Sequence, residues 1–406
     1  MMNMLYELKK LFSAKLVWGL LALNLLYMLF IPFQGLRHNY RDHIQSVKTQ
    51  QKLYTQMQAA YPQPQAMQDA LEQELLRIQQ QDWTTDAPGI YGETLRQDFF
   101  AVNGVYEHVR YLVTQVPHNR SKIIKEMLYD MSQADQSGEQ DWFTERSNAL
   151  AIKQYNRILP LKLVSSGIHE GTQYILFNYT MWEYLMLAFL VLMTVRMFTM
   201  DLISGAYQMI HTSKHAEKSL FFRKFGALAL VALLILLFHL GVELIANCTI
   251  LGLSGFHLPL QQLETFEMCP YFITIGGFYV LKTAMKYLAY LWVIGLTAWI
   301  ASVLRKPLTA GGLGLFLSCG GLVVHMVFYL RQTNVTARKI YRVLRMLLPQ
   351  GLLNAREYLQ TFDVANVLQY PVGRLQLCCG ITICSGILFI MLAYGRWCRI
   401  ERRGYA

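Results

Sequence analysis

Two pairs of ionisable residues have the spacing that brings side chains together on one face of a helix. His211 and His215 are four residues apart, which sets two imidazoles side by side as zinc sites require. No third ligand is evident nearby, so we predict no metal site. His239 and Glu243 have the same spacing but lie within a strongly apolar run. Ionisable groups in such a run are costly and often functional.

Two lysines in a later apolar region offer partners for this acid. Lys282 and Lys286 are again four residues apart, and either ammonium could pair with Glu243. We therefore interpret His239, Glu243, Lys282 and Lys286 as a substrate or ion pathway, or as a structural ion pair within the membrane. The alternative is that the acid and the lysines extend their charged ends to the lipid headgroups.

Signatures of catalysis are missing from the sequence. It has no HExxH and no GxSxG motif, and Asp201 is the only aspartate near an apolar span. Phosphoryl transfer from ATP needs a phosphate-cradling GxxxxGK[ST] loop, which is also absent. We predict no catalytic residues and no cofactor in this chain, although an intramembrane enzyme remains an alternative class.

The composition is that of a membrane protein with a water-facing insertion. Of the 406 residues, 54% are hydrophobic and only 16% are charged, against about 25% charged in soluble domains. Residues 33–179 hold 14 of the 37 basic and 16 of the 26 acidic residues, so the rest of the chain has 23 basic and 10 acidic. This basic excess lies beside apolar segments, as lipid-headgroup anchors do. No basic groove or aromatic platform indicates nucleic-acid binding.

The apolar runs predict an all-α polytopic membrane protein with six transmembrane helices. Each run is long enough to cross about 30 Å of hydrocarbon. The expected spans are 16–32, 180–200, 225–247, 284–304, 308–330 and 377–396.

Basic residues in the short flanks predict the orientation. With six spans, the clusters before span one, between spans two and three, between spans four and five, and after span six all lie on one side. That side is expected to be the cytoplasm, with both termini there and residues 33–179 outside. The expected location is a plasma membrane, and the cysteine-free insertion and its Gln-rich composition favour a bacterial one.

The segments outside the spans have their own patterns. Residues 1–15 predict an amphipathic helix lying in the headgroup layer, and the long apolar run after it favours an uncleaved span over a signal peptide. Apolar stripes predict that 33–179 is a helical extracellular domain, with breaks at Pro62, Pro88 and Ser137 and near Pro117. Residues 397–406 are expected to form a cytoplasmic tail.

Residues 331–376 are basic yet expected outside, contrary to the charge rule that the short flanks follow. Apolar and basic residues alternate there at helical spacing, which indicates an amphipathic segment contacting lipid or, equally, a solvated helix. The expected lipid contacts are Arg338, Lys339, Arg342 and Arg345.

The cytoplasmic loop 201–224 carries the most informative pattern. An acidic residue ends an apolar span, a short Gly-containing helix is expected from Leu202 to Ile210, and a Thr-Ser-Lys stretch leads to Lys224. This loop resembles the coupling-helix loop of type-2 ABC exporter permeases. The six spans, the N-terminal interfacial helix and the large domain between spans one and two are similar too. The family commonly has Glu where this chain has Asp201, and Gly-Arg where it has His215 and Ala216.

The resemblance implies a mechanism of alternating access. Two permeases, identical or homologous, would surround a central path, and each loop would dock on a cytosolic ABC ATPase that binds ATP and Mg²⁺ and drives export of a peptide, lipid-like molecule, drug or ion. The ATPase-coupling residues implied are Asp201, Ser204, Gly205, Ile210, His211, Lys214 and Lys224. A non-transporting membrane sensor that relays an external signal through residues 33–179 is the main alternative.

Overall fold

The computed structural model is almost entirely helical. It describes residues 15–40, 44–81, 87–137, 142–158, 182–203, 216–250, 252–253, 255–304, 306–329, 340–341, 343–344, 346–348 and 350–402. The long helices of the apolar part are α2 (Lys15–Tyr40), α9 (Trp182–Ile203), α11 (Ala216–Ile250), α12 (Ile275–Leu304), α13 (Pro307–Tyr329) and α16 (Arg374–Arg402).

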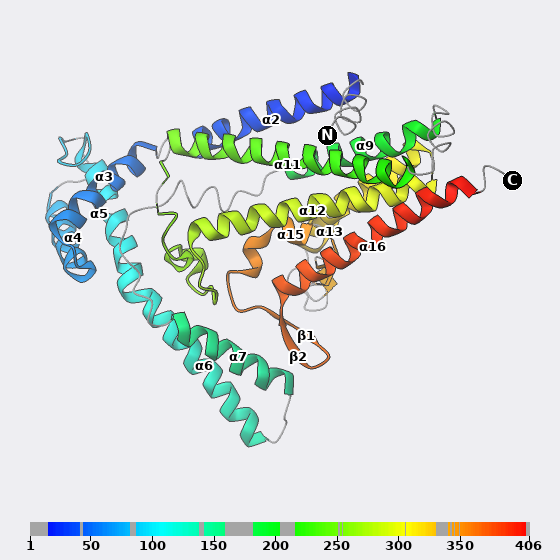
Figure 1. Ribbon diagram of the computed structural model, residues 1–406. Helices are drawn as coiled ribbons and strands as arrows, with labels where there is room; N and C mark the ends of the chain where they lie inside the picture. Colours follow the sequence, from blue (N-terminus) through cyan, green and yellow to red (C-terminus); the bar gives the residue numbers. More distant parts are fainter. Residues whose placement is uncertain are drawn as a thin grey trace.

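These helices form a bundle in which α9, α11, α12 and α16 run side by side (Figure 1). Within the described residues, four helical stretches are long and apolar enough to cross a membrane: Glu183–Met200, Leu220–Ile250, Ile275–Leu304 and Arg374–Cys398. Shorter apolar stretches occupy Val17–Tyr27 in α2 and Pro307–Gly320 in α13. Four such helices are consistent with a transmembrane protein.

Helix α12 makes its most extensive contact with α16, and glycines allow the two backbones to approach. A Cβ at Gly295 would lie 3.2 Å from Ile390 Cγ1 and 3.4 Å from the Gly386 carbonyl oxygen. The Trp292 indole Nε1 donates a 2.8 Å hydrogen bond to Ser385 Oγ across the same interface. Apolar lipid gives little hydrophobic drive for helix association, so close packing and interhelical hydrogen bonds hold these helices together.

Several helices extend beyond the predicted spans, and two of these boundaries bear on the candidate site. Helix α12 begins at Ile275, nine residues before the predicted span 284–304, because Thr274 caps it: Thr274 Oγ1 accepts a 3.0 Å hydrogen bond from the Gly277 amide. Helix α11 begins at Ala216, so the last part of the predicted loop 201–224 is helical and continues directly into the span.

The insertion is helical, as its apolar stripes predict. Its elements are α3 (Ile44–Ala60), α4 (Pro64–Gln79), α5 (Leu95–Arg110), the π-helix η1 (Tyr111–Gln115), α6 (Val116–Ser137) and α7 (Trp142–Ile158). The predicted breaks at Pro62 and Pro88 are confirmed, but the one near Pro117 is wrong. There the helix widens into a π-turn, which relieves the clash between the proline ring and the preceding turn.

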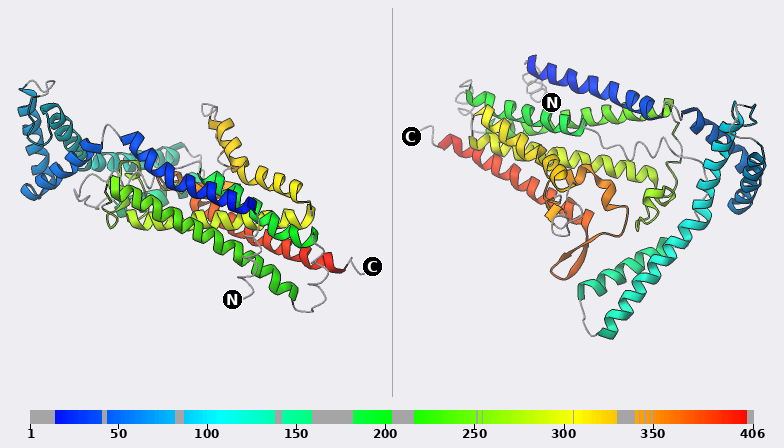
Figure 2. Two further views of the ribbon diagram at one scale, coloured as in Figure 1. Left: turned by 90° about the horizontal axis from the view of Figure 1, so that it is seen from above. Right: turned by 180° about the vertical axis from the view of Figure 1, so that it is seen from behind.

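The insertion has two small cores of its own. Helices α3, α4 and α5 pack through Tyr54, Leu71 and Val105, which are fully buried. Helices α6 and α7 leave this cluster and fold back toward the β-hairpin near the start of α16, as Figures 1 and 2 show. There Tyr155 and Ile158 pack with Phe362.

A short β-hairpin is the element that the sequence analysis missed. Residues 331–376 were expected to form one amphipathic segment. The described part instead holds the short helix α15 (Gln350–Leu353), the 3-10 helix η4 (Ala355–Tyr358), and the antiparallel strands β1 (Val364–Val367) and β2 (Tyr370–Gly373). Two further 3-10 helices, η2 (Leu260–Gln262) and η3 (Glu264–Phe266), precede α12. Leu368 and Gln369 form the hairpin turn at φ 51° and 68°. Primed two-residue turns require positive φ at both positions, and Leu-Gln does not carry the Asn-Gly or Asp-Gly signal for one.

Candidate functional site

A cluster of buried charged side chains lies inside the bundle. Lys286 Nζ on α12 lies 2.5 Å from Glu183 Oε1 in the first turn of α9, and the two side chains are 3% and 1% exposed. Both groups are therefore removed from water and lipid headgroups alike. Burial of this kind is stable only when the charges are paired closely.

Helix α11 brings the second acid to the same place. Glu243 is 4% exposed and interacts electrostatically with Lys282, Lys286 and Glu183. His239, one turn earlier, is 5% exposed and faces the same two lysines. The four residues predicted as a pathway or an intramembrane ion pair thus come together, and with Glu183 the cluster holds two acidic and two lysine side chains.

Glu183 is the member that sequence reasoning missed. It sits in the first turn of an apolar helix, where an acid is expected at the membrane surface, and only the packing of α9 on α12 makes it a partner for Lys286. The available signal was that Glu183 is the single acid between residues 180 and 200, whereas the two lysines of the later span had only Glu243 as a predicted partner.

One carboxylate oxygen of the cluster is free to bind a further partner. Glu183 Oε2 is buried and has no hydrogen-bond partner among the residues that the structure describes. A carboxylate oxygen in this state can accept a proton, a cation or a donor group from a ligand. The arrangement can therefore bind or relay charge within the bundle, which is what ionisable groups in transporters do.

The cluster is near one end of the bundle. Glu243 lies seven residues before the end of α11, and Lys282 lies seven residues after the start of α12. At about 1.5 Å per residue, both are roughly 10 Å inside their helices. The insertion contacts the loop that precedes α12 at this same end.

That contact is a polar interface centred on Glu267. Its carboxylate accepts hydrogen bonds from Tyr111 Oη at 2.5 Å and Asn119 Nδ2 at 3.3 Å, and its carbonyl accepts one from Arg120 Nε at 3.3 Å. Tyr155 Oη adds a 3.3 Å bond to the Met268 carbonyl. Burial lowers the pKa of the Arg120 guanidinium from its usual value. The insertion is thus joined to the chain eight residues before α12 begins.

Lys224 occupies the opposite end of the bundle and is buried there. Its Nζ donates a 2.6 Å hydrogen bond to the Met197 carbonyl of α9 and lies 5.4 Å from the ring centroid of Trp397 and 6.0 Å from that of Phe198. The ammonium favours the carbonyl end of a helix and the faces of aromatic rings. Lys224 therefore joins α9, α11 and α16, and its charge faces into the bundle.

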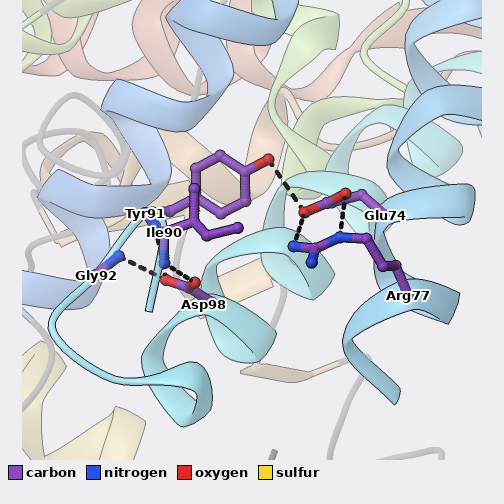
Figure 3. Close-up of polar contacts among 6 residues, drawn as sticks. All are labelled: Glu74, Arg77, Ile90, Tyr91, Gly92 and Asp98. Atoms are coloured by element: carbon purple, nitrogen blue, oxygen red, sulfur yellow. Dashed lines mark hydrogen bonds and ion pairs between the residues drawn. The ribbon is translucent and has the colours of Figure 1, made fainter. Parts of the chain in front are cut away.

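Asp98 in the insertion organises a loop by itself. Its carboxylate accepts hydrogen bonds from the backbone amides of Ile90, Tyr91 at 2.9 Å and Gly92 at 2.5 Å (Figure 3). Next to it, Glu74 pairs with Arg77 at 2.6 Å, and the hydrogen bond from Arg77 lowers the pKa of Glu74. Since the amides are already occupied by Asp98, this loop is built for stability and not for an external anion.

The remaining predicted site residues lie outside the described residues. This holds for the loop around the predicted short helix and for the predicted lipid contacts; of Asp201, the structure describes only the helical backbone. The residues outside are Ser204, Gly205, Ile210, His211, Lys214, Arg338, Lys339, Arg342 and Arg345.

Within the part of the chain that the structure describes, no three metal-binding side chains come together. Cys248 and Cys269, which flank the same loop, are both free thiols. Comparison with models of protein families, with curated proteins and with solved structures finds no match to this chain.

Proposed function

We propose that this chain is the permease subunit of an ATP-binding cassette exporter and that a separate ATPase supplies the energy. The observation that carries the proposal is the buried cluster of Glu183, Glu243, Lys282 and Lys286. A bundle stabilised by packing alone has no need of four buried charges, and replacing such pairs by apolar residues is often neutral or stabilising. Charges retained at this cost indicate a path for a polar or charged substrate.

The proposed topology has six spans, with α2 and α13 crossing beside the four long apolar helices. Its support is the sorting of charged groups between the two ends of the bundle. Arg196 near the end of α9 and Lys306 before α13 lie at the end where Lys224 is buried. The insertion contacts the other end through Glu267. We propose that the first end is cytoplasmic and the second faces outward, in a bacterial plasma membrane.

Residues 201–215 are proposed to dock on the ATPase, with Asp201, Gly205, Ile210 and Lys214 forming the contact. The buried Lys224 would act from inside, by transmitting force from the loop to α9 and α16. The energy of ATP binding would then rock the bundle between inward- and outward-facing states, and a second permease would complete the path.

A site-specific cross-link tests this proposal. A photoreactive amino acid at position 210 should capture a protein with a phosphate-binding GxxxxGK[ST] loop in native membranes, whereas one at the exposed position 145 in the insertion should not. The Lys214→Glu variant should lower ATP hydrolysis by the purified complex without lowering the amount of folded chain. Capture of the same proteins from both positions, or unchanged hydrolysis, would refute the proposed docking.

The sensor alternative is favoured by one observation, the hydrogen-bonded contact between the insertion and the loop before α12. Comparing the variant Glu267→Gln with the double variant Glu183→Gln/Lys286→Gln distinguishes a sensor from an exporter. A sensor should lose its output in the first and keep it in the second. An exporter should show altered substrate-stimulated ATP hydrolysis in the second, because the path itself has changed.

A further inference from the structure

A cavity of about 530 Å³ opens between α2, α9 and α13. It is lined almost entirely by apolar groups, including Val17 and Leu20 of α2, Leu192 of α9, and Leu308 and Gly312 of α13. Its size falls within the range of ligand pockets. It does not involve the charge cluster, which lies at the other end of α9.

One cation faces this apolar cavity. Arg196 belongs to its lining, and Arg196 Nε is buried with no hydrogen-bond partner among the described residues. The residue lies within the apolar stretch Glu183–Met200, four residues before its end. A guanidinium next to apolar walls is stable only if it reaches water or pairs with an anion.

The position of the cavity indicates which anion could pair with Arg196. The lining runs from Leu192 to Met200 on α9 and from Pro307 to Leu315 on α13, about 12 Å along each helix. It reaches the ends of the apolar stretches, where lipid headgroups begin. Lys15 and Lys306, next to the lining in sequence, are both exposed, so the end of the cavity near the headgroups is basic.

We propose that this cavity binds an anionic phospholipid from the adjoining leaflet. One acyl chain occupies the apolar cavity, and the phosphate accepts hydrogen bonds from the planar fork of Arg196, which matches phosphate geometry. Lys15 and Lys306 add attraction for negatively charged headgroups. The bound lipid would hold α13 against α2 and α9. The site depends on membrane insertion but not on the proposed transport function.

Two glycines in the lining give a direct way to fill the cavity. A Cβ at Gly312 meets no atom within 4 Å, and one at Gly311 meets only Leu192 Cδ2 at 3.9 Å. Gly312→Leu therefore places a side chain in the space proposed for the acyl chain without a clash at Cβ. Gly241→Leu on α11 is the matched control, because its Cβ also meets nothing within 4 Å and it lies outside the cavity lining.

The test measures lipid binding by native mass spectrometry in a neutral detergent, with phosphatidylglycerol and phosphatidylcholine of identical acyl chains. Wild-type chain should prefer phosphatidylglycerol. Arg196→Gln should weaken the binding of phosphatidylglycerol at least tenfold and reduce the preference for it, because the guanidinium charge attracts a net-negative headgroup more strongly than a zwitterionic one. Arg223→Gln, which removes one charge outside the cavity lining, should leave the preference unchanged.

Gly312→Leu should weaken binding of both lipids, and Gly241→Leu should weaken neither. Thermal unfolding without added lipid checks that each variant is folded, and Arg196→Lys provides a variant that keeps the charge and should retain part of the preference. The proposal is overturned if Arg196→Gln keeps the wild-type preference, or if Gly312→Leu binds lipid as well as its control does. It is also overturned if the chain without bound lipid forms dimers in which a second copy of the chain occupies the cavity.

Discussion

The ion pair between Glu183 and Lys286 makes the sharpest prediction about the bundle. At an effective dielectric constant of about 20, two unit charges 2.5 Å apart attract by roughly 7 kcal/mol. Most of this attraction offsets the cost of taking both charges out of water. The net value of the pair is therefore small, but the loss of one partner is expensive.

We expect Glu183→Gln and Lys286→Met each to lower the free energy of unfolding by about 3 kcal/mol, the lower end of the 3–5 kcal/mol range for broken buried pairs. The lower end applies because the remaining charge still interacts with a neighbour: Lys286 with Glu243, or Glu183 with Lys282. The double variant leaves no unpaired charge from this pair, so it should lie within about 1–2 kcal/mol of the wild type.

The assay is a double-mutant cycle on the full chain in bilayer nanodiscs, with unfolding driven by steric trapping. The control cycle is Glu107→Gln with Arg110→Gln, an ion pair at 3.3 Å whose side chains are about half exposed. Its coupling energy should be below about 1 kcal/mol. If the double variant in the bundle is destabilised by the full sum of its two single variants, the two charges are not coupled and the reasoning is refuted.

Three further predictions concern other buried groups. Lys224→Met should lower the free energy of unfolding by about 2 kcal/mol, the value of one charge-assisted hydrogen bond with its aromatic contacts, whereas Lys306→Met at an exposed site should change it by less than about 0.5 kcal/mol. Asp98→Asn should raise amide hydrogen exchange in residues 87–94, and equal exchange in Asp69→Asn, an exposed control, would contradict this. Burial raises the pKa of the Cys269 thiol to about 11, so its contribution to stability is present below pH 9 and is lost as pH rises toward 11; Cys269→Ser should show a smaller loss of unfolding temperature over that range.

Much of the fold follows from the sequence because hydrophobic periodicity is local. The apolar runs predict helices where α2, α9, α11, α12, α13 and α16 lie, and the stripes of the insertion predict its helices. The residues at which those helices begin and end were harder to predict. Lys282 looks like the edge of a span in the sequence, whereas in the structure it is buried and lies seven residues inside α12.

The part of the site that depends on local spacing was predictable, and the part that depends on contacts between helices was not. His239 and Glu243 share a helix face by spacing alone, as do Lys282 and Lys286. The choice of Glu183 as the partner of Lys286 depends on how α9 packs against α12, and no local pattern contains that information. Lys224 is a similar case: its sequence context suggested a surface contact, and its burial depends on Trp397, which lies 173 residues later.

The β-hairpin and the π-turn escaped prediction because their signals are weak. Leu368 and Gln369 adopt positive φ without glycine, assisted by a 2.9 Å hydrogen bond from the Gln369 amide to Asn366 Oδ1. Pro117 usually ends or kinks a helix, but here one wider turn absorbs it.

The orientation of the loop between α9 and α11 is the claim on which the proposed function depends most. Single cysteines at positions 213 and 145, in a chain otherwise free of cysteine, can be exposed to a membrane-impermeant maleimide on intact cells. We expect the thiol at 145 to react at once and the thiol at 213 to react only after the membrane is permeabilised. Labelling of position 213 from outside intact cells would contradict the proposed docking of a cytosolic ATPase.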